Sequence, residues 1–506
     1  MKLSAILLLA CALVARASPR RKPAAKSPHV GIVGGGASGL TTAFLLQERG
    51  YRVTILERSG NVGGFAITHK LGGMAYDMGA MFVPGASIVG PGIEPTLERM
   101  IEFAQSRLEP TMDMATLNQT TKLLEKVPEP LEKYTRRELI DQLTRGLFMS
   151  WQLFYCAAVD SSTCLRCGAV CGSSNMLLVG FGATFGVPAY AELVLHLFDG
   201  LGAGPTANGA TFKSALSPFA VSEVVHVLRK LGLDPRDLAF GVPQHPRLFE
   251  MLKTERWYFF REGFQTFWKK LAKRAKMSVE NKVSVTSMLR EGDKWKVTAT
   301  KGRRETEKTF AFDHVIVTTA PQDAHPFLPK GEQKDLIAQG IPRVPPNDVF
   351  LVEAEDTDSC DNDIDNRRVA FWPTGLGQGS DAFVDPATWV NGVKTFFVLK
   401  RHAKNNIYAI GTYVLDPAIS VNDAFDALKT YAATELGLKV TRMLKHERFV
   451  FPSGPKAIDT DAWQQAWAPL QGRDGLWFNG EAICGSGIPR ITQFTTGFVA
   501  AGFPDL

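Results

Sequence analysis

The chain has 506 residues, with 57 basic and 51 acidic side chains and a formal net charge of +6. Six of the basic residues lie within residues 2–26, ahead of the first acidic residue, Glu48, so from residue 27 onward the counts are 51 and 51. A neutral body argues against a nucleic-acid partner. The hydrophobic content of 45% and charged content of 21% exclude a largely disordered chain.

Residues 1–17 are predicted to be a secretory signal peptide. Lys2 supplies the charged start, residues 3–14 the apolar stretch, and residues 15–17 a cleavage site of small residues. The alternative is an uncleaved anchor, but the apolar run is short for a bilayer. Residues 18–28 are basic and proline-rich and are predicted to form a spacer. We therefore expect a secreted protein without a stable membrane span.

Cysteine and acidic clusters raise the question of a metal site. Four of the seven cysteines lie within residues 156–171, a pattern that indicates a metal or iron–sulfur site in a cytosolic protein and disulfides in a secreted one. The aspartates of residues 356–365 suggest calcium, but their spacing lacks the glycine and terminal glutamate of an EF-hand. Asn118 begins a glycosylation sequon. We expect disulfides, a glycan and no metal.

The first predicted elements form a strand–turn–helix–strand unit. An apolar strand over residues 29–33 is followed by a helix over residues 38–49 and a second strand over residues 52–56, which ends at Glu57. The length of this unit is that of a βαβ motif.

The rest of the chain is predicted to contain a helical region followed by strands. Residues 95–260 have a mostly helical pattern, and their apolar stretch 175–198 is interrupted by glycine and proline, which favours a core segment or pocket wall over a membrane span. Strands are predicted within residues 277–320 and at residues 476–478.

These elements predict an α/β fold with a Rossmann-type nucleotide-binding domain assembled from discontinuous segments, and an α+β substrate domain. The expected limits are 29–95, 259–335 and 451–506 for the first domain, and 96–258 and 336–450 for the second.

Residues 34–39 (Gly-Gly-Gly-Ala-Ser-Gly) fit the dinucleotide pattern G-x-G-x-x-G between a strand and a helix. Gly34 permits the tight turn, Gly36 lets the backbone approach a pyrophosphate, and Gly39 allows close helix–strand packing. Glu57, 18 residues beyond Gly39, is placed to accept from ribose hydroxyls and would repel a 2′-phosphate. NAD and FAD share this pattern, so it does not choose between them.

Four further stretches narrow the choice of cofactor. Residues 57–64 carry a second glycine pair after the acidic residue, and residues 76–82, 313–321 and 476–481 follow in order along the chain. Together they resemble the flavin-containing amine oxidase superfamily, over about 200 residues. The resemblance implies FAD as the cofactor.

The resemblance also implies which residues contact FAD. Gly63 and Gly64 match a pair near the phosphates, the backbone of Val283 matches the adenine position, and Glu481 matches an acidic residue near the ribityl chain. Phe65 stands where the family often has arginine. The full implied set is Gly34, Gly36, Ala37, Ser38, Gly39, Glu57, Arg58, Gly63, Gly64, Phe65, Met81, Phe82, Val283, Gly480 and Glu481.

The substrate is less defined. The residues after Glu481 match neither the aromatic frame nor the covalent cysteine of amine oxidases, and the lysine that many of them hold near the flavin has no match. Residues 449–452, 180–182 and 187–190 are similar to a branch with polyenoic fatty acid isomerases. We expect hydride transfer to flavin N5 from a small hydrophobic substrate, an unsaturated fatty acid or an amine. A double-bond isomerase and a non-catalytic flavin-binding protein are the alternatives. Arg490 is either a surface residue or a partner for a substrate carboxylate.

Overall fold

The computed structural model describes a discontinuous set of residues. They are 27–84, 96–110, 114–117, 124–125, 131, 133–159, 178–198, 224–225, 227–229, 231–233, 257–302, 306–319, 321–331, 334, 346–356, 369–371, 390–402, 405–414, 416–449, 468–480 and 488–506. The predicted signal peptide and most of the spacer, Asn118 and the aspartates after Asp356 lie outside this set, as do all the cysteine side chains.

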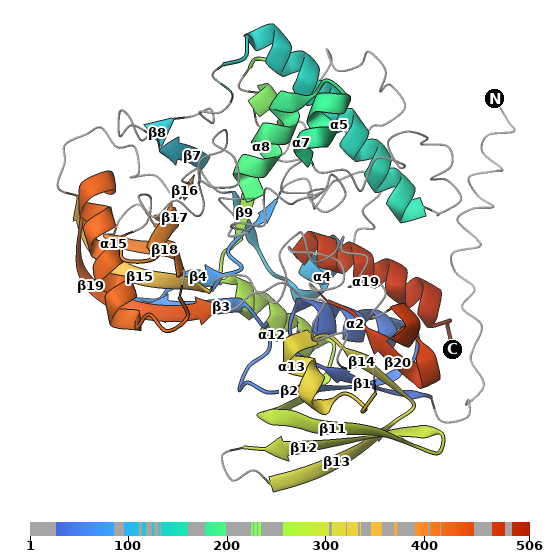
Figure 1. The fold of residues 1–506 in the computed structure, drawn as a ribbon. Coiled ribbons are helices and arrows are strands. Elements are labelled where there is room, and N and C mark those ends of the chain that lie inside the picture. Colours follow the sequence, from blue (N-terminus) through green and yellow to red (C-terminus); the bar gives the residue numbers. More distant parts are fainter. Residues whose placement is uncertain are drawn as a thin grey trace, which may run out of the picture.

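A five-stranded parallel sheet forms the lower part of the molecule (Figure 1). Its strands are, in spatial order, β10 (Ser278–Asn281), β2 (Arg52–Glu57), β1 (His29–Val33), β14 (His314–Val317) and β20 (Leu476–Phe478). Strands from three distant stretches of sequence therefore join one sheet, which confirms the predicted α/β fold. The central strands are apolar along their length because both faces of the sheet are covered.

One face of this sheet is covered by helices and the other by a second, smaller sheet. Helices α2 (Ala37–Glu48) and α19 (Ile488–Gly502) pack against each other, and α4 (Thr96–Ala104) and α12 (Phe264–Arg274) complete the same apolar cluster. The opposite face packs against the antiparallel strands β11 (Val283–Glu291), β12 (Lys294–Lys301) and β13 (Thr306–Phe312) (Figure 1). We call this assembly the cofactor unit.

The second large sheet has seven strands and is mostly antiparallel. In order they are β19 (Leu438–Phe449), β15 (Asn347–Asp356), β18 (Ile407–Val414), β17 (Val393–Leu399), β16 (Val369–Phe371), β7 (Met114–Leu117) and β8 (Leu124–Glu125). Helix α15 (Val421–Leu436) packs on its outer face (Figure 1). Its inner face packs against β4 (Met74–Gly79) and contributes to an apolar cluster that we call the inner cluster.

Three helices and one hairpin complete the inner cluster. Helices α5 (Arg136–Val159), α7 (Leu178–Thr184) and α8 (Pro188–Phe198) lie at the top of Figure 1. The hairpin of β3 (Ala66–Leu71) and β4 (Met74–Gly79) runs from the cofactor unit toward the second sheet.

A small three-stranded sheet and a few single-turn elements complete the described fold. The sheet is formed by β5 (Val83–Pro84), β9 (Trp257–Phe260) and β6 (Leu108–Pro110). Single turns of helix are α13 (Pro321–Ala324), η6 (His325–Phe327), η9 (Ala468–Leu470) and η10 (Arg473–Gly475).

The expectation of a mostly helical stretch over residues 95–260 is too simple. The structure also places four short strands there, β6 to β9, and β7 pairs in parallel with β16, about 250 residues further along the chain. Strands of two to four residues carry almost no alternation pattern, and their partners are distant in sequence, so only the folded chain reveals them.

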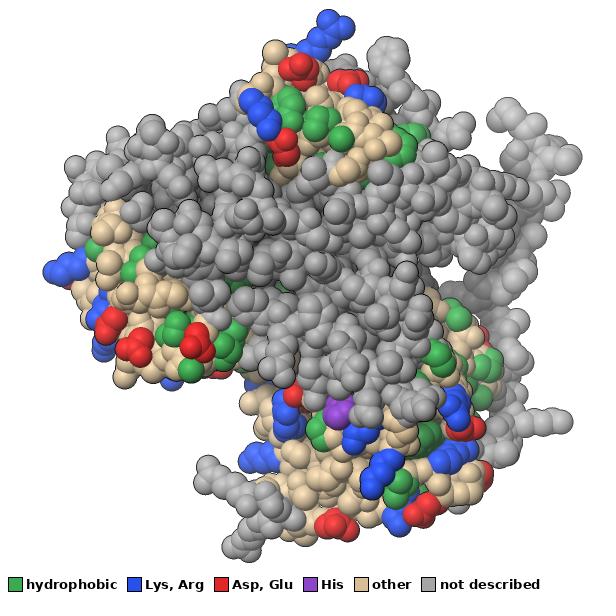
Figure 2. Space-filling model, in the orientation of Figure 1, with side chains coloured by type: hydrophobic (Ala, Val, Ile, Leu, Met, Phe, Trp, Pro, Cys, Tyr) green, Lys and Arg blue, Asp and Glu red, His purple; other side chains and the backbone are tan. Residues whose placement is uncertain are grey.

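The apolar stretch 175–198 contains two helices that meet at Gly186, which has a φ of +64°. Phe181 and Tyr190 are fully buried in the inner cluster, in agreement with a core segment. Within the described part of the chain, no helix is both long and apolar enough to cross a membrane. On the face shown in Figure 2, basic and acidic side chains are interspersed.

Candidate functional site: a nucleotide cradle beside an apolar wall

Residues 34–39 need glycine where two stretches of backbone approach each other closely. Gly34 has a φ of +110°, and its N–H donates to the Leu56 carbonyl over 2.9 Å. A Cβ atom added at Gly39 would lie 2.0 Å from the Gly34 carbonyl oxygen. Any side chain at position 39 would therefore force the strand and α2 apart, in agreement with the packing role inferred from the sequence.

The N-terminus of α2 suits an anion. Its N-cap, Gly36, has no side chain to accept a hydrogen bond, and the first turn carries no acidic residue. The Ser38 hydroxyl in that turn is buried and has no hydrogen-bond partner among the described residues. Free backbone N–H groups, an unused hydroxyl and the positive end of the helix dipole together fit a phosphate.

The second glycine pair packs directly on this loop. Gly63 donates its N–H to the Gly35 carbonyl over 2.8 Å, and a Cβ atom at Gly64 would lie 3.1 Å from the Gly36 Cα. Both Gly63 and Gly64 have positive φ values, +121° and +57°. The fold thus brings the two glycine motifs together as one wall of a narrow backbone cradle.

Two implied residues, Glu57 and Val283, lie at the carboxyl ends of β2 and β10. Glu57 accepts hydrogen bonds from the backbone N–H groups of Gly35 and Ser59, both at 2.6 Å. The chain next to Val283 reaches the same place, because Lys282 donates its N–H to the Ser59 carbonyl. Carboxylate and backbone therefore lie side by side at the sheet edge where Rossmann-type folds bind the nucleoside.

Arg58, next to Glu57, forms an exposed ion pair. Its guanidinium lies 3.5 Å from the carboxylate of Asp323 in α13, and both side chains are largely exposed. Arg58 follows β2, whereas the phosphate loop follows β1.

Buried polar residues that the sequence did not single out hold β20 and β14 beside the loop. The Asn479 amide donates to Thr42 of α2 and Thr495 of α19, both at 3.0 Å. The Thr318 hydroxyl donates to the Val33 and Gly34 carbonyls. A sequence signal existed, because both residues belong to stretches that carry the family resemblance, but side-chain partners this distant appear only in the fold.

The remaining implied cofactor residues divide into placed and undescribed ones. Gly480 has a φ of +128°, and a Cβ atom there would lie 3.8 Å from the Ser38 hydroxyl, so β20 ends at the start of α2. Glu481 lies outside the described residues, and Arg490 lies in the first turn of α19 with its side chain outside them.

Phe65, Met81 and Phe82 lie where the cofactor unit meets the second sheet. The Phe65 ring is in edge-to-face contact with Phe449 at the end of β19, with centroids 5.6 Å apart. The Phe65 carbonyl accepts from the N–H of Ala80, so the segments around residues 65 and 80 run together. Met81 is buried, and Phe82 is in edge-to-face contact with Phe259.

An apolar wall on the second sheet faces the β3–β4 hairpin and Met81, which adjoin the cofactor unit. Along β15, Val349 and Leu351 point into the inner cluster, whereas Phe350 and Val352 point toward α15. We call the apolar residues of the second sheet in this cluster the wall: Val349, Leu351, Phe397, Leu399, Ala409, Tyr413 and Phe449. The same cluster contains residues of the facing segments, Tyr76, Met78, Met81 and Phe259.

Two buried carboxylates, Asp77 and Asp348, lie next to this wall or behind it, and both have hydrogen-bond partners. Burial raises the pKa of Asp77, against the opposing effects of Arg401, of the Thr68 hydroxyl and of a backbone N–H. Burial also acts to raise the pKa of Asp348, but Arg448 and His446 hold that pKa below its ordinary value. Among the described residues, no group of three or more His, Cys, Asp or Glu side chains is arranged to hold a metal.

Two family models match the chain. Residues 32–93 match an NAD(P)-binding Rossmann-like domain, and residues 195–377 match a flavin containing amine oxidoreductase. Residues of both the cradle and the apolar wall fall within these matches.

Similar proteins agree with both assignments. A stretch of 60 residues is 50% identical to an L-amino-acid oxidase of Siganus canaliculatus, and 73 residues are 37% identical to probable polyamine oxidase 4 of Arabidopsis thaliana. These alignments cover 12% and 14% of this chain, and only 11% and 14% of the relatives' own length.

Likeness in fold extends over nearly the whole chain. The crystal structure of a CLA-producing fatty acid isomerase from P. acnes superposes with a TM-score of 0.65 at 14% identity, covering 95% of this chain and 100% of that one. Putrescine oxidase bound to putrescine superposes with a TM-score of 0.56 at 13% identity, covering 94% and 99%. At these identities the likeness shows the fold alone. The glycine cradle and the match of residues 195–377 to a flavin containing amine oxidoreductase agree with the resemblance to the flavin-containing amine oxidase superfamily, whose cofactor is FAD.

Proposed function

We propose that this protein is a secreted FAD-dependent oxidoreductase that removes a hydride from a small apolar substrate. The observation that carries the substrate class is the apolar wall, which the second sheet presents to the β3–β4 hairpin and Met81. Secretion rests on the leader sequence of residues 1–17. When bound, FAD supplies the hydride acceptor at its N5 atom.

The chain itself would bind, orient and exclude water. We propose that the α2 N-terminus and Ser38 hold the pyrophosphate, Glu57 the ribose, and the backbone at Val283 the adenine. Gly63, Gly64 and Phe65 would line the path from the phosphates to the flavin ring, with Met81 and Phe82 beside the ring. Gly480 and Glu481 would approach the ribityl chain.

The wall favours an apolar substrate because a charged amine would have to give up its hydration there. Burying an ammonium group without a partner costs several kcal/mol. Leu351, in the middle of β15, is fully buried within the wall. An unsaturated fatty acid fits this surface better than a polyamine does. Arg490 stays a candidate for holding the acid's carboxylate.

A substrate panel tests the proposal. Purified protein that carries FAD is mixed without oxygen with polyunsaturated fatty acids, L-amino acids or polyamines, while flavin absorbance is recorded. We expect bleaching with the unsaturated acids. Bleaching by amines alone would contradict the apolar substrate. Protein that neither carries nor takes up FAD would overturn the proposal as a whole.

The same panel separates the two alternative functions. Growth of conjugated-diene absorbance without net bleaching of the flavin would identify a double-bond isomerase, which the apolar wall suits equally well. FAD that no substrate reduces would indicate a non-catalytic flavin-binding protein.

Two neighbouring residues give a matched pair of variants for the substrate surface. Leu351→Ala removes apolar contact on the wall, whereas Val352→Ala removes it on the opposite face of β15, toward α15. Both should lower stability by about 2–4 kcal/mol. Only Leu351→Ala should raise the KM for the apolar substrate. Equal KM values would contradict a substrate surface at the wall.

A further inference from the structure

A buried ion pair joins the cofactor unit to the second sheet. Asp77 of β4 is 2% exposed and Arg401, just beyond β17, is 4% exposed. Arg401 Nη1 donates to Asp77 Oδ2 over 2.7 Å, although the two residues are 324 positions apart. A charge pair this deeply buried loses its hydration, and apolar side chains would stabilise the fold as well or better. Stability alone therefore does not explain its presence.

The other oxygen of Asp77 caps a helix that belongs to a different segment. Asp77 Oδ1 accepts from the backbone N–H of Phe264 at 2.8 Å and from the Thr68 hydroxyl at 2.5 Å. The Thr68 oxygen in turn accepts from the backbone N–H of Gln265. Phe264 and Gln265 begin α12, whose own N-cap is Gly263 and offers no side chain. The β3–β4 hairpin thus supplies the missing cap, and the helix dipole favours the carboxylate.

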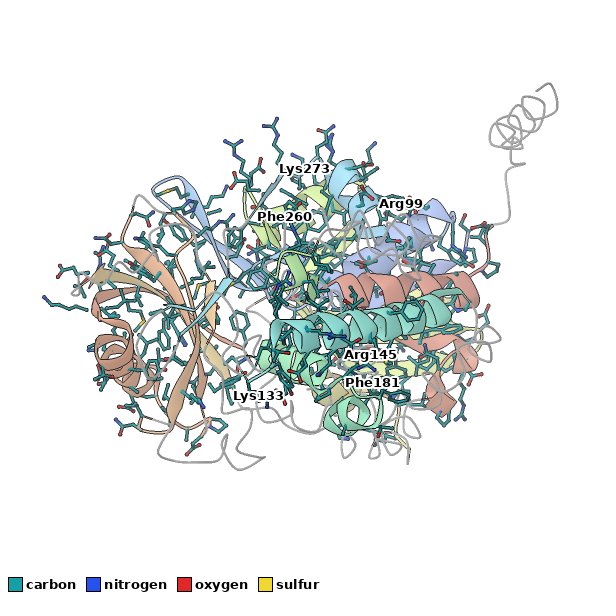
Figure 3. The ribbon with its side chains drawn as sticks, turned by 90° about the horizontal axis from the view of Figure 1, so that it is seen from above. Arg99, Lys133, Arg145, Phe181, Phe260 and Lys273 are labelled. Carbon is teal, nitrogen blue, oxygen red and sulfur yellow. The ribbon has the colours of Figure 1, made fainter. Side chains whose placement is uncertain are left out.

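Arg401 extends the junction to β9. Its Nη2 donates to the Phe260 carbonyl, and its guanidinium lies 4.9 Å from the centroid of the Phe259 ring. Figure 3 shows Phe260 in the interior, between the second sheet and the helices of the cofactor unit. One ion pair therefore fixes the hairpin, the start of α12, β9 and the end of β17 relative to one another.

The junction stands directly before the segment that we place beside the flavin. Tyr76 and Met78 flank Asp77 in β4 and pack in the inner cluster. Gly79 follows with a φ of +84°, and a Cβ atom there would meet both the Phe65 carbonyl and the Phe449 ring. The chain from residue 79 to residue 82 is thus held between the glycine cradle and the wall.

We propose that Asp77 and Arg401 are positioning residues that set the spacing between residues 79–82 and the apolar wall, and so the approach of the substrate to the flavin. This proposal rests on the proposed function, because it takes the flavin ring to lie beside residues 79–82. An ion pair suits the task because its hydrogen bonds are directional, whereas apolar packing tolerates small shifts.

A double variant removes the ion pair but keeps the cap. In D77N/R401M, the asparagine oxygen still accepts from the N–H of Phe264, while the charge pair is gone. The matched control is D348N/R448M. Arg448 binds both oxygens of Asp348, at 2.7 and 2.8 Å, and this pair joins β15 to β19 entirely within the second sheet.

The experiment compares the two double variants as FAD-loaded proteins. Thermal unfolding, the visible circular dichroism of bound FAD and the rate of anaerobic flavin bleaching are measured for each. We expect both variants to lose stability. Only D77N/R401M should change the flavin dichroism, and it should slow bleaching by about 100-fold, as misplacement by 1 Å does elsewhere. R401K retains the charge, and we expect it to restore part of the rate.

Four outcomes are decisive. Flavin dichroism and bleaching that are alike in the two double variants would show that the Asp77 pair is only structural. Should D77N/R401M fail to fold, the single variant D77N, which keeps the cap of α12, answers the same question, because unchanged dichroism in that variant overturns the proposal. Wild-type protein that binds FAD but reacts with no substrate overturns the proposed function alone, since dichroism still reports on positioning. Wild-type protein without FAD overturns both the proposed function and the positioning role.

Discussion

The parallel sheet and the seven-stranded sheet differ in the kind of polar side chain that they bury. In the described part of the parallel sheet and its covering helices, the buried polar side chains are neutral, such as Ser38, Thr42 and Asn479. The second sheet and its connections bury charges, among them Asp348, Lys394 and Arg401. The cradle for an anionic cofactor works through backbone N–H groups and close approach, and the Glu57 carboxylate lies at the strand end, where it would hold the ribose and not the phosphates. The second sheet has no such ligand, and there charges can connect strands.

This contrast separates two kinds of sensitivity to mutation. We expect the cofactor unit to be destabilised by substitutions that remove space for the backbone. We expect the second sheet to be destabilised by substitutions that remove charge partners. The predictions below test that separation, beginning with the largest expected effect.

The largest effect is expected from Gly39→Val. The new Cβ atom would lie 2.0 Å from the Gly34 carbonyl oxygen, so β1 and α2 must separate. We expect the loss of FAD binding and of at least about 4 kcal/mol of unfolding free energy. The ratio of flavin to protein absorbance and urea unfolding provide the measurements.

Gly497→Ala is the control for that experiment. Gly497 lies in α19 of the same unit, and a Cβ atom there would meet nothing within 4 Å. We expect full FAD content and a gain of up to about 1 kcal/mol from the better helix former. If Gly39→Val retained normal FAD content, the backbone would not be close-packed as described.

The second prediction concerns the charge pair of the second sheet. Arg448→Met leaves the fully buried Asp348 carboxylate without its bidentate partner and should cost about 3 kcal/mol. FAD affinity should stay unchanged, because the pair lies within β15 and β19. Calorimetry and an FAD titration of the same sample provide the test. A large loss of FAD affinity would show that the charge pair of the second sheet also affects cofactor binding.

The Asp348 pair also predicts a dependence of stability on pH. The pKa of Asp348 is lower in the folded chain than its ordinary value of 3.8, despite the opposing effect of burial, because Arg448 and His446 favour the carboxylate. The folded state therefore gains stability above that value, and the gain is lost as the pH falls through the lowered pKa. Unfolding of wild-type protein and Asp348→Asn across this acidic range should converge toward low pH. Parallel curves would contradict the prediction.

A smaller effect is expected where the two regions touch. Phe65→Ala removes the edge-to-face contact with Phe449 and should cost about 1 kcal/mol. Phe103→Ala is the matched control, because Phe103 is also partly exposed and makes a similar contact with Phe44 inside the cofactor unit. Only the Phe65 variant should weaken FAD binding, which a titration measures. Equal FAD affinities would place Phe65 outside the cofactor's path.

The smallest effect is expected from Arg58→Ala. The exposed pair of Arg58 with Asp323 should contribute less than about 0.5 kcal/mol, because water and salt screen it. Comparison with Asp323→Ala decides whether Arg58 has a second role. A loss of FAD affinity in the Arg58 variant alone would show that its guanidinium contacts the cofactor. If neither variant loses FAD affinity, Arg58 contributes only to the surface ion pair.

Local patterns predicted the cofactor unit well. The strand at residues 29–33 and the helix after Gly36 appear within one residue of their predicted limits, because hydrophobic runs and glycine turns act over a few neighbouring positions. The FAD cofactor and the family also follow from these motifs. The predicted domain limits, disulfides, glycan and secretion remain predictions.

The short strands between residues 95 and 260 escaped prediction for a physical reason. β7 has four residues and pairs in parallel with β16, while β6 pairs with β9 across about 150 positions. Such pairing is specified by which partners the whole fold brings together, and not by the sequence of either strand.

The sequence by itself determined the phosphate loop, the acidic strand end and the family, because each depends on residues close together in the chain. The tertiary structure alone decided that Gly64 packs on Gly36, that the second sheet turns an apolar wall toward the β3–β4 hairpin, and that Asp77 meets Arg401. Contacts between residues hundreds of positions apart arise only when a compact chain excludes water from both partners, and no local pattern records that event.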